Sequence, residues 1–141
     1  MALTGIRVID LTDERGIYGT KLLADLGAQV IRPEEPEGDP LRNRGPFMKR
    51  DCDRLSLWHS FFASNRTFVS VDKANLIETQ TLQHLAEAAD IICVDEQTDF
   101  IDLESAKAAN PSLVVIELSS FGKGGPWANY LAPDIVAGAL G

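Results

Sequence analysis

Residues 5–31 read GIRVIDLTDERGIYGTKLLADLGAQVI and carry three consecutive structural signals. Residues 5–12 form a short, nearly continuous apolar run, which is typical of a strand buried on both faces. From Gly16 onward apolar residues recur at helical spacing, and Gly27 stands where a helix C-cap is expected, before a second strand that begins at Val30. A strand, a helix and a strand within about 30 residues predict one βαβ unit.

The rest of the chain repeats this alternation. Residues 33–45 hold three prolines and two glycines among charged residues, which indicates an exposed loop. The periodicity predicts helices at 56–64, 76–89 and 102–109 and strands at 67–71, 91–94 and 113–118. The inward side chains of the 76–89 helix are expected to be Leu82, Leu85, Ala86 and Ala89. Five strands alternating with helices predict an α/β fold, a Rossmann-like open parallel sheet with helices on both faces.

The last segment predicts a helix that is apolar on all sides. Pro133 is well placed at the first helical position, and the residues that follow up to Gly141 are almost wholly apolar. A helix of this kind needs cover on every side, and no later segment is present to supply it. We therefore expect either an incomplete large domain or a partner that provides the remaining layer.

Composition limits the function and the compartment. The 141 residues carry a net charge of −8, so neither nucleic acid nor an anionic membrane is expected as a partner. The two cysteines, Cys52 and Cys93, form neither a disulfide framework nor a zinc-ligand spacing, so no metal site is expected and the compartment is predicted to be reducing. The amino end lacks a signal-peptide pattern, and no apolar stretch reaches about 18 residues, which predicts a cytoplasmic protein.

Ligands of open α/β sheets bind beyond the carboxyl ends of the strands. The loop after the first strand has Gly16 and Gly19 in the spacing G-x-x-G, instead of the G-x-G-x-x-G of dinucleotide-binding loops. Glu34 and Glu35 follow at about the sequence distance at which a ribose-binding acid follows those glycines. Asp13 and Glu14 would repel a pyrophosphate at the start of the helix. Plain turn and capping chemistry is the alternative to a dinucleotide site here.

Two further segments are candidates for an anionic ligand. Seven of the thirteen basic residues gather in one span: Arg42, Arg44, Lys49, Arg50, Arg54, Arg66 and Lys73. Arginine forks suit phosphate oxygens, although a solvated loop explains the same pattern. Residues 119–126 are rich in glycine and contain Lys123, which suits either a backbone approach to a ligand or a tight turn. His59 and His84 are interpreted as structural or solvated residues.

Several short motifs follow one another in a family-specific order. They are LTGIRVIDL (3–11), KLLADLGAQVI (21–31), GDPLR (38–42), GPF (45–47), NR (65–66), VD (71–72), ADII (89–92), NPSLV (110–114) and FGxxGP (121–126). Along essentially all 141 residues the chain resembles the amino-terminal part of the class III CoA-transferases, the CaiB/BaiF family. The resemblance implies that residues 1–141 are the amino-terminal part of a Rossmann-like CoA-binding large domain, in a homodimer or larger assembly of interlinked subunits.

The resemblance also implies a reaction. Family transferases move CoA from an acyl-CoA thioester to a carboxylic acid through an aspartyl intermediate, which divides one difficult exchange into easier steps. The nucleophilic aspartate is expected beyond Gly141, so no catalytic residue is expected within the chain, and Asp134 is not that residue. The alternatives are an acyl-CoA racemase or isomerase of the same family, or a non-catalytic CoA- or nucleotide-binding module.

Coenzyme A or acyl-CoA is expected as a substrate and not as a permanently bound cofactor. The resemblance and the basic span together predict that Arg42 and Lys73 meet its phosphates. The groove at the strand ends is expected to be lined by Val71, Asp72, Asp95, Ser119, Phe121 and Gly122. Two family motifs depart from the usual pattern: A-G-P-F reads RGIY at 15–18, and E-N-F reads VDE at 94–96.

Overall fold

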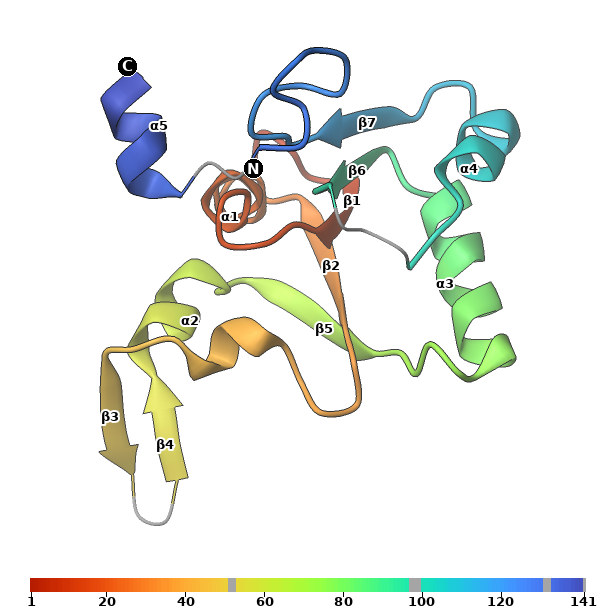
Figure 1. Cartoon of the computed structure of the whole chain (residues 1–141). Coiled ribbons are helices and arrows are strands. Elements are labelled where there is room, and N and C mark those ends of the chain that lie inside the picture. Colours follow the sequence, from red (N-terminus) through yellow and green to blue (C-terminus); the bar gives the residue numbers. More distant parts are fainter. Residues whose placement is uncertain (51–52, 97–99, 131–132, 141) are drawn as a thin grey trace.

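The computed structural model describes residues 1–50, 53–96, 100–130 and 133–140 of the chain. Five strands form one parallel sheet (Figure 1). In spatial order they are β5 (Arg66–Ser70), β2 (Gln29–Glu34), β1 (Arg7–Leu11), β6 (Ile91–Val94) and β7 (Val114–Glu117). This doubly wound order confirms the α/β prediction.

The apolar run that opens the chain lies at the centre of the sheet. Strand β1 pairs with β2 on one side, where Val8 faces Val30, and with β6 on the other, where Val8 faces Ile91. Val8 is 0% exposed and Ile9 is 1% exposed. Val8, Ile9 and Leu11 are buried because helices cover both faces of the sheet, and Asp10 is the one charged residue among the buried residues of this strand.

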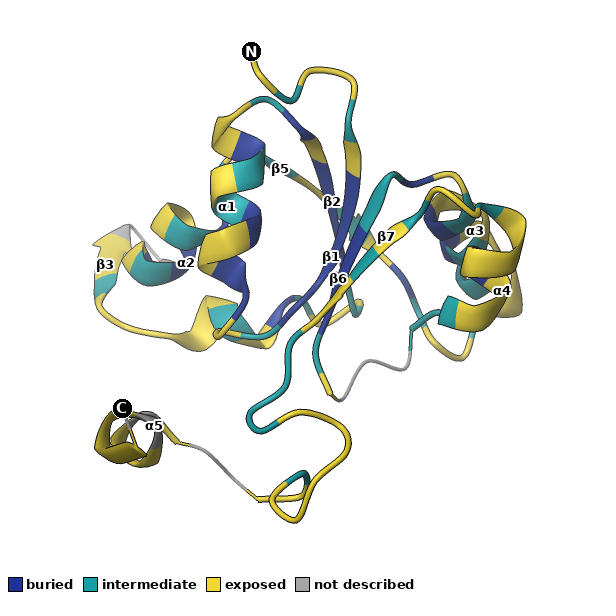
Figure 2. Ribbon diagram, turned by 90° about the horizontal axis from the view of Figure 1, so that it is seen from above, coloured by how far each residue is buried: buried dark blue, intermediate teal, exposed yellow. Residues whose placement is uncertain are grey.

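Helices lie on both faces of the sheet (Figure 2). Helix α1 (Ile17–Asp25) covers one face, and helices α3 (Leu76–Glu87) and α4 (Leu103–Ala109) cover the other. The two faces give two core clusters. The cluster beneath α1 contains Val8, Ala24, Ala28, Val30 and Cys93. The cluster beneath α3 and α4 contains Ile9, Leu11, Ile31, Ala86, Ala89, Ile92, Val94 and Ala106.

Glycines stand at two tight positions around α1. Gly27 follows the helix with a φ of +102°, a conformation that favours glycine and ends the helix as predicted. At the start of the helix, a Cβ on Gly16 would lie 2.4 Å from Leu118 Cδ1 and 2.5 Å from Thr12 Cβ. Only glycine therefore lets the helix begin this close to the ends of β1 and β7.

The inward face predicted for α3 is partly wrong. Leu82 and Ala86 are buried, whereas Leu85 is 37% exposed. At 3.6 residues per turn, Leu85 lies about 60° around the helix from Leu82, at the margin of the apolar stripe. The buried residues of this segment are Leu82, Ala86 and, just beyond the helix, Ala89. Ala86 and Ala89 belong to the core cluster that contains Ile9 and Ile92 of the sheet.

The segment predicted as an exposed loop, 33–45, contains more structure than expected. Strand β2 continues through Pro33, which has no N–H to donate. Pro33 lies beyond the last residue of β2 that pairs with β1, so no hydrogen bond to β1 is lost. A short 3₁₀ helix η1 (Pro40–Asn43) follows. A hairpin of β3 (Phe47–Arg50) and β4 (Asp53–Ser56) comes next and was not predicted (Figure 1).

The remaining helices agree with the sequence. Helix α2 (Leu57–Phe62) lies within the predicted 56–64, with the Ser56 hydroxyl accepting a hydrogen bond from His59 N. Helix α5 (Asp134–Leu140) follows Pro133, and Ile135 within it is 81% exposed. In the described ranges no helix combines the length and apolar character needed to cross a membrane.

Cys93 is expected to be inert toward alkylation in the folded protein. Its side chain is 3% exposed on β6, and burial, aided by the nearby Asp10 carboxylate, raises the pKa of the thiol to about 12. Because only the thiolate attacks an alkylating reagent, iodoacetamide at pH 8 should leave Cys93 unmodified until denaturant is added. Peptide mass mapping measures Cys93 separately from Cys52, which lies outside the described residues. Native Cys93 that reacts as fast as the unfolded control would contradict the prediction.

Candidate functional site

A buried carboxylate lies at the centre of the sheet, near the carboxyl end of β1. Asp10 is 0% exposed. It accepts hydrogen bonds from Thr12 N at 3.1 Å, Thr12 Oγ1 at 2.7 Å and Thr20 Oγ1 at 3.0 Å. Arg32 Nη1, from the neighbouring strand β2, donates to Asp10 Oδ2 at 3.0 Å. A buried charge with this many donors is satisfied without water.

Arg66 brings a second guanidinium to the same carboxylate. Its side chain is 0% exposed and forms an ion pair with Asp10. It also donates to the carbonyl of Ile17 at 2.5 Å and to that of Phe62 at 2.9 Å, so it joins β5 to β1, α1 and α2. Burial lowers the pKa of Arg66, although Asp10 opposes the shift. The assignment of Arg66 to a surface basic segment was therefore wrong, because its charge is used inside the fold.

Asp39, just before η1, completes the buried network. Its side chain is 4% exposed and accepts from Arg32 Nε at 2.6 Å and from Leu41 N at 2.9 Å. The buried His59 Nε2 lies 3.8 Å away. Burial alone would raise the pKa of Asp39, but contacts from His59 and Arg32 hold it well below its ordinary value. We call Asp10, Arg32, Asp39 and Arg66 the buried charge network.

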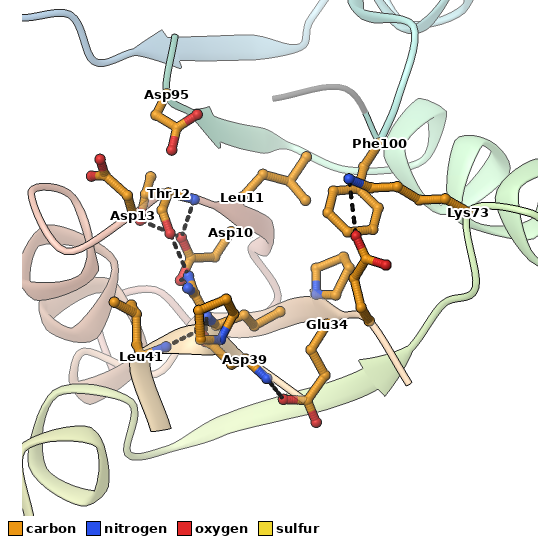
Figure 3. Close-up of a pocket in the computed structure, with 14 residues that line it drawn as sticks. Asp10, Leu11, Thr12, Asp13, Glu34, Asp39, Leu41, Lys73, Asp95 and Phe100 are labelled. Atoms are coloured by element: carbon orange, nitrogen blue, oxygen red, sulfur yellow. Dashed lines mark hydrogen bonds and ion pairs between the residues drawn. The ribbon is translucent and has the colours of Figure 1, made fainter. Parts of the chain in front are cut away.

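A cavity of about 320 Å³ opens beside this network, at the carboxyl ends of β1, β2 and β6 (Figure 3). Its size falls within the range of small-molecule sites. The lining residues are Asp10, Leu11, Thr12, Asp13, Arg32, Pro33, Glu34, Glu35, Asp39, Pro40, Leu41, Lys73, Asp95 and Phe100. The apolar side chains can pack against a flat ring, and the carboxylates can accept hydrogen bonds from hydroxyl groups. A nucleoside carries both a flat base and ribose hydroxyls.

Two of the predicted site residues line the cavity, and two more come just before Lys73 in the chain. Lys73 and Asp95 line it. Val71 is 2% exposed and donates its N–H to the last carbonyl of β2 at 2.8 Å. Asp72 Oδ1 accepts from Ala74 N at 2.8 Å, so this side chain shapes the turn after β5.

Arg42 lies outside the lining residues, on η1. Its Nε and Nη2 donate to the Glu34 carboxylate at 3.0 and 3.1 Å, and its guanidinium lies 4.7 Å from the centre of the Phe68 ring. The Arg42 side chain is 44% exposed. The two hydrogen bonds and the ring contact hold the guanidinium in one orientation near the end of β2.

The structure does not bring Ser119, Phe121 and Gly122 into the cavity. Gly122 N donates to Ser119 Oγ at 3.0 Å, Gly122 has a φ of +79°, and Phe121 packs edge-on against Trp127 at 6.0 Å. These residues follow β7, at the opposite edge of the sheet from β5. Four strand spacings separate the two edges, about 19 Å. A single ligand that touches both sets must extend along the strand ends.

The sequence prediction missed Asp10 and Arg32 as parts of the site. A single charged residue within an apolar strand was the available signal, since such a group needs a buried partner. Glu34 and Glu35, predicted at the position of a ribose-binding acid, do line the cavity. Within the described ranges no group of three or more metal-ligating side chains comes together.

The chain matches a known protein family. The family model described as "CoA-transferase family III" matches residues 3–141. The chain is similar to a Thauera aromatica succinyl-CoA:(R)-benzylsuccinate CoA-transferase subunit, with 31% identity over 140 residues, 95% of this chain and 34% of that protein. It is 33% identical over 150 residues to a succinate–glutarate CoA-transferase of Agrobacterium fabrum, over 99% of this chain and 38% of that protein.

Solved structures show the same fold. A CaiB/BaiF family protein from Brucella suis matches with a TM-score of 0.86 and 28% identity, over 98% of this chain and 38% of that one. The chain thus spans 34% to 38% of the length of these three relatives. With its family model matched over nearly every residue, the chain belongs to CoA-transferase family III.

Proposed function

We propose that this chain binds the nucleotide end of CoA or an acyl-CoA, as the amino-terminal part (residues 1–141) of a CoA-binding large domain. The observation that carries the proposal is the cavity at the carboxyl ends of β1, β2 and β6, in a chain that matches the family over residues 3–141. In open α/β sheets this edge is where ligands bind. Stacking on Phe100 and hydrogen bonds to carboxylates would hold an adenosine there.

The proposed reaction moves CoA between an acyl-CoA thioester and a carboxylic acid. A carboxylate attacks the thioester carbonyl and displaces CoA as a thiolate, which gives a mixed anhydride. The thiolate then attacks the enzyme's carbonyl and releases the acyl group as a carboxylate, and an incoming acid reverses these steps. The nucleophilic aspartate is assigned beyond Gly141, so this chain contributes binding and positioning. A homodimer or larger assembly is part of the same proposal.

Each predicted site residue has a proposed place along the ligand. Lys73 and Arg42 meet phosphates near β2 and β5. Val71, Asp72 and Asp95 border the cavity at the nucleoside. The loop after β7 contacts the ligand further along the strand ends, through the last three predicted residues, Ser119, Phe121 and Gly122.

Replacing Arg42 by Ala is expected to weaken CoA binding by about 1–3 kcal/mol, because hydrogen bonds from a guanidinium to phosphate are charge-assisted. Affinity should also fall with added salt, since exposed charges are screened over about 10 Å at 0.1 M. Titration calorimetry of the 141-residue chain with CoA measures both effects. The matched control is Arg7→Ala, at the amino end of β1 and the opposite end of the sheet from the cavity, which should leave binding unchanged. Salt-independent binding, or equal affinity in the Arg42→Ala variant, would mean that this loop is only a solvated surface.

A further inference from the structure

Each cation predicted to meet phosphate already faces a carboxylate from the end of β2. Lys73 Nζ lies 3.1 Å from Glu35 Oε1, and Arg42 Nη2 lies 2.9 Å from Glu34 Oε2. Lys73 also lies 4.2 Å from the centre of the Phe100 ring, beside which Figure 3 shows it at the cavity. A phosphate that approaches Lys73 therefore competes with Glu35 for the ammonium group.

Carboxylates outnumber cations among the residues that line the cavity. Six carboxylates line the cavity, against the positive charges of Arg32 and Lys73 among the lining residues described. Arg32 is engaged by Asp10 and Asp39 inside the fold. Three of the carboxylates are also paired with cations outside the lining: Asp10 with Arg66, Asp13 with Arg15 and Glu34 with Arg42. A phosphate group brings about −1.5 to −2 charges, and near Lys73 it meets the Glu35 carboxylate, which already holds the ammonium group. A ribose hydroxyl donates a hydrogen bond to a carboxylate and meets no such repulsion.

We propose that Glu35 is a specificity-determining residue of the cavity: by holding Lys73, it lowers the affinity for a ligand that carries a phosphate on its ribose. The affinity for a ligand whose ribose carries no phosphate is not lowered. The inference rests on the proposed CoA-binding function and adds to it the group that sets how strongly the ribose phosphate is recognised.

Glu35, and not Glu34, is the residue that can be changed without disturbing the fold. Glu34 accepts a hydrogen bond from Asp39 N at 3.0 Å in addition to its bonds with Arg42, so it supports the backbone beside the buried charge network. The pair between Glu35 and Lys73 lies at the surface, with side chains 44% and 35% exposed. Exposed pairs of this kind contribute little to stability.

The test compares CoA with dephospho-CoA, which differ only in the ribose phosphate, by titration calorimetry at low ionic strength. Glu35→Gln is expected to strengthen CoA binding about tenfold, the scale of one like charge removed from a partly exposed site, and to change dephospho-CoA binding less than about twofold. Glu37→Gln, an exposed acid two residues away and outside the lining, is the matched control and should change neither. Adding Lys73→Met to Glu35→Gln should cancel the gain.

Two results would overturn the inference while CoA binding itself stands. One is a CoA affinity that Glu35→Gln leaves unchanged, and the other is an equal gain for both ligands, which would reflect general charge and not phosphate recognition. Failure of every variant, and of the unaltered chain, to bind either ligand would overturn the proposed function together with this inference.

Discussion

Asn in place of Asp10 is expected to lower the free energy of unfolding by about 3–5 kcal/mol, the scale found when one partner of a buried ion pair is removed. Asp10 is 0% exposed and pairs with both Arg32 and Arg66, whose side chains are 7% and 0% exposed. The amide keeps the shape but not the charge, so two buried guanidinium groups would be left to share Asp39. Denaturant unfolding at pH 7 measures the loss.

The control for this prediction is Glu104→Gln. Glu104 pairs with Lys107 at 3.7 Å on the surface and is 89% exposed, so its loss should change stability by less than about 1 kcal/mol. If Asp10→Asn does not fold, the double variant Asp10→Asn/Arg66→Met removes one uncompensated charge and should recover part of the stability. An Asp10→Asn loss no larger than that of the Glu104 control would contradict the prediction.

Replacing Asp39 by Asn is expected to cost about 3 kcal/mol at pH 7 and progressively less in acid. The pKa of Asp39 is lower in the folded chain than the value of about 3.9 expected in the unfolded chain. The carboxylate therefore contributes stability that is full above the unfolded pKa and is lost as the pH falls through the folded pKa. Burial raises the pKa of Asp39, whereas the contacts with His59 and Arg32 lower it and so favour the ionised form.

Urea unfolding of the unaltered chain and of Asp39→Asn, at a series of pH values from 7 down to 3, tests this linkage. The difference between the two proteins should be constant near neutral pH and should narrow below about pH 4. A difference that stays constant throughout would show that Asp39 acts through its shape and hydrogen bonds rather than through its charge.

The fold class could be predicted because its signals are local. The apolar run of β1, the periodicity of α1 and Gly27 at the helix end each concern residues close together in sequence, and the structure confirms all three. Alternation of such units then limits the sheet to a parallel, doubly wound arrangement.

The errors concern places where tertiary contacts override local pattern. The strands β3 and β4 lie in a stretch of mixed charges without the alternation of apolar and polar residues that indicates a strand. They form because each pairs with the other. Leu85 has the right spacing to face inward, but it is 37% exposed, and the buried residues of α3 are Leu82 and Ala86. Arg66 looks like its basic neighbours in sequence, yet it is buried because Asp10 lies within reach across the fold.

The sequence by itself determined the alternation of the five sheet strands with helices, and the family motifs along the chain, because each depends on residues near one another. Only the tertiary structure decided which charges meet. Arg32 and Arg66 reach Asp10 from 22 and 56 residues away. Lys73, in the turn after β5, reaches Glu35, which follows the neighbouring strand β2. The strength of an ion pair depends on distance and burial in space, so these contacts, and the cavity they border, exist only once the strands lie side by side.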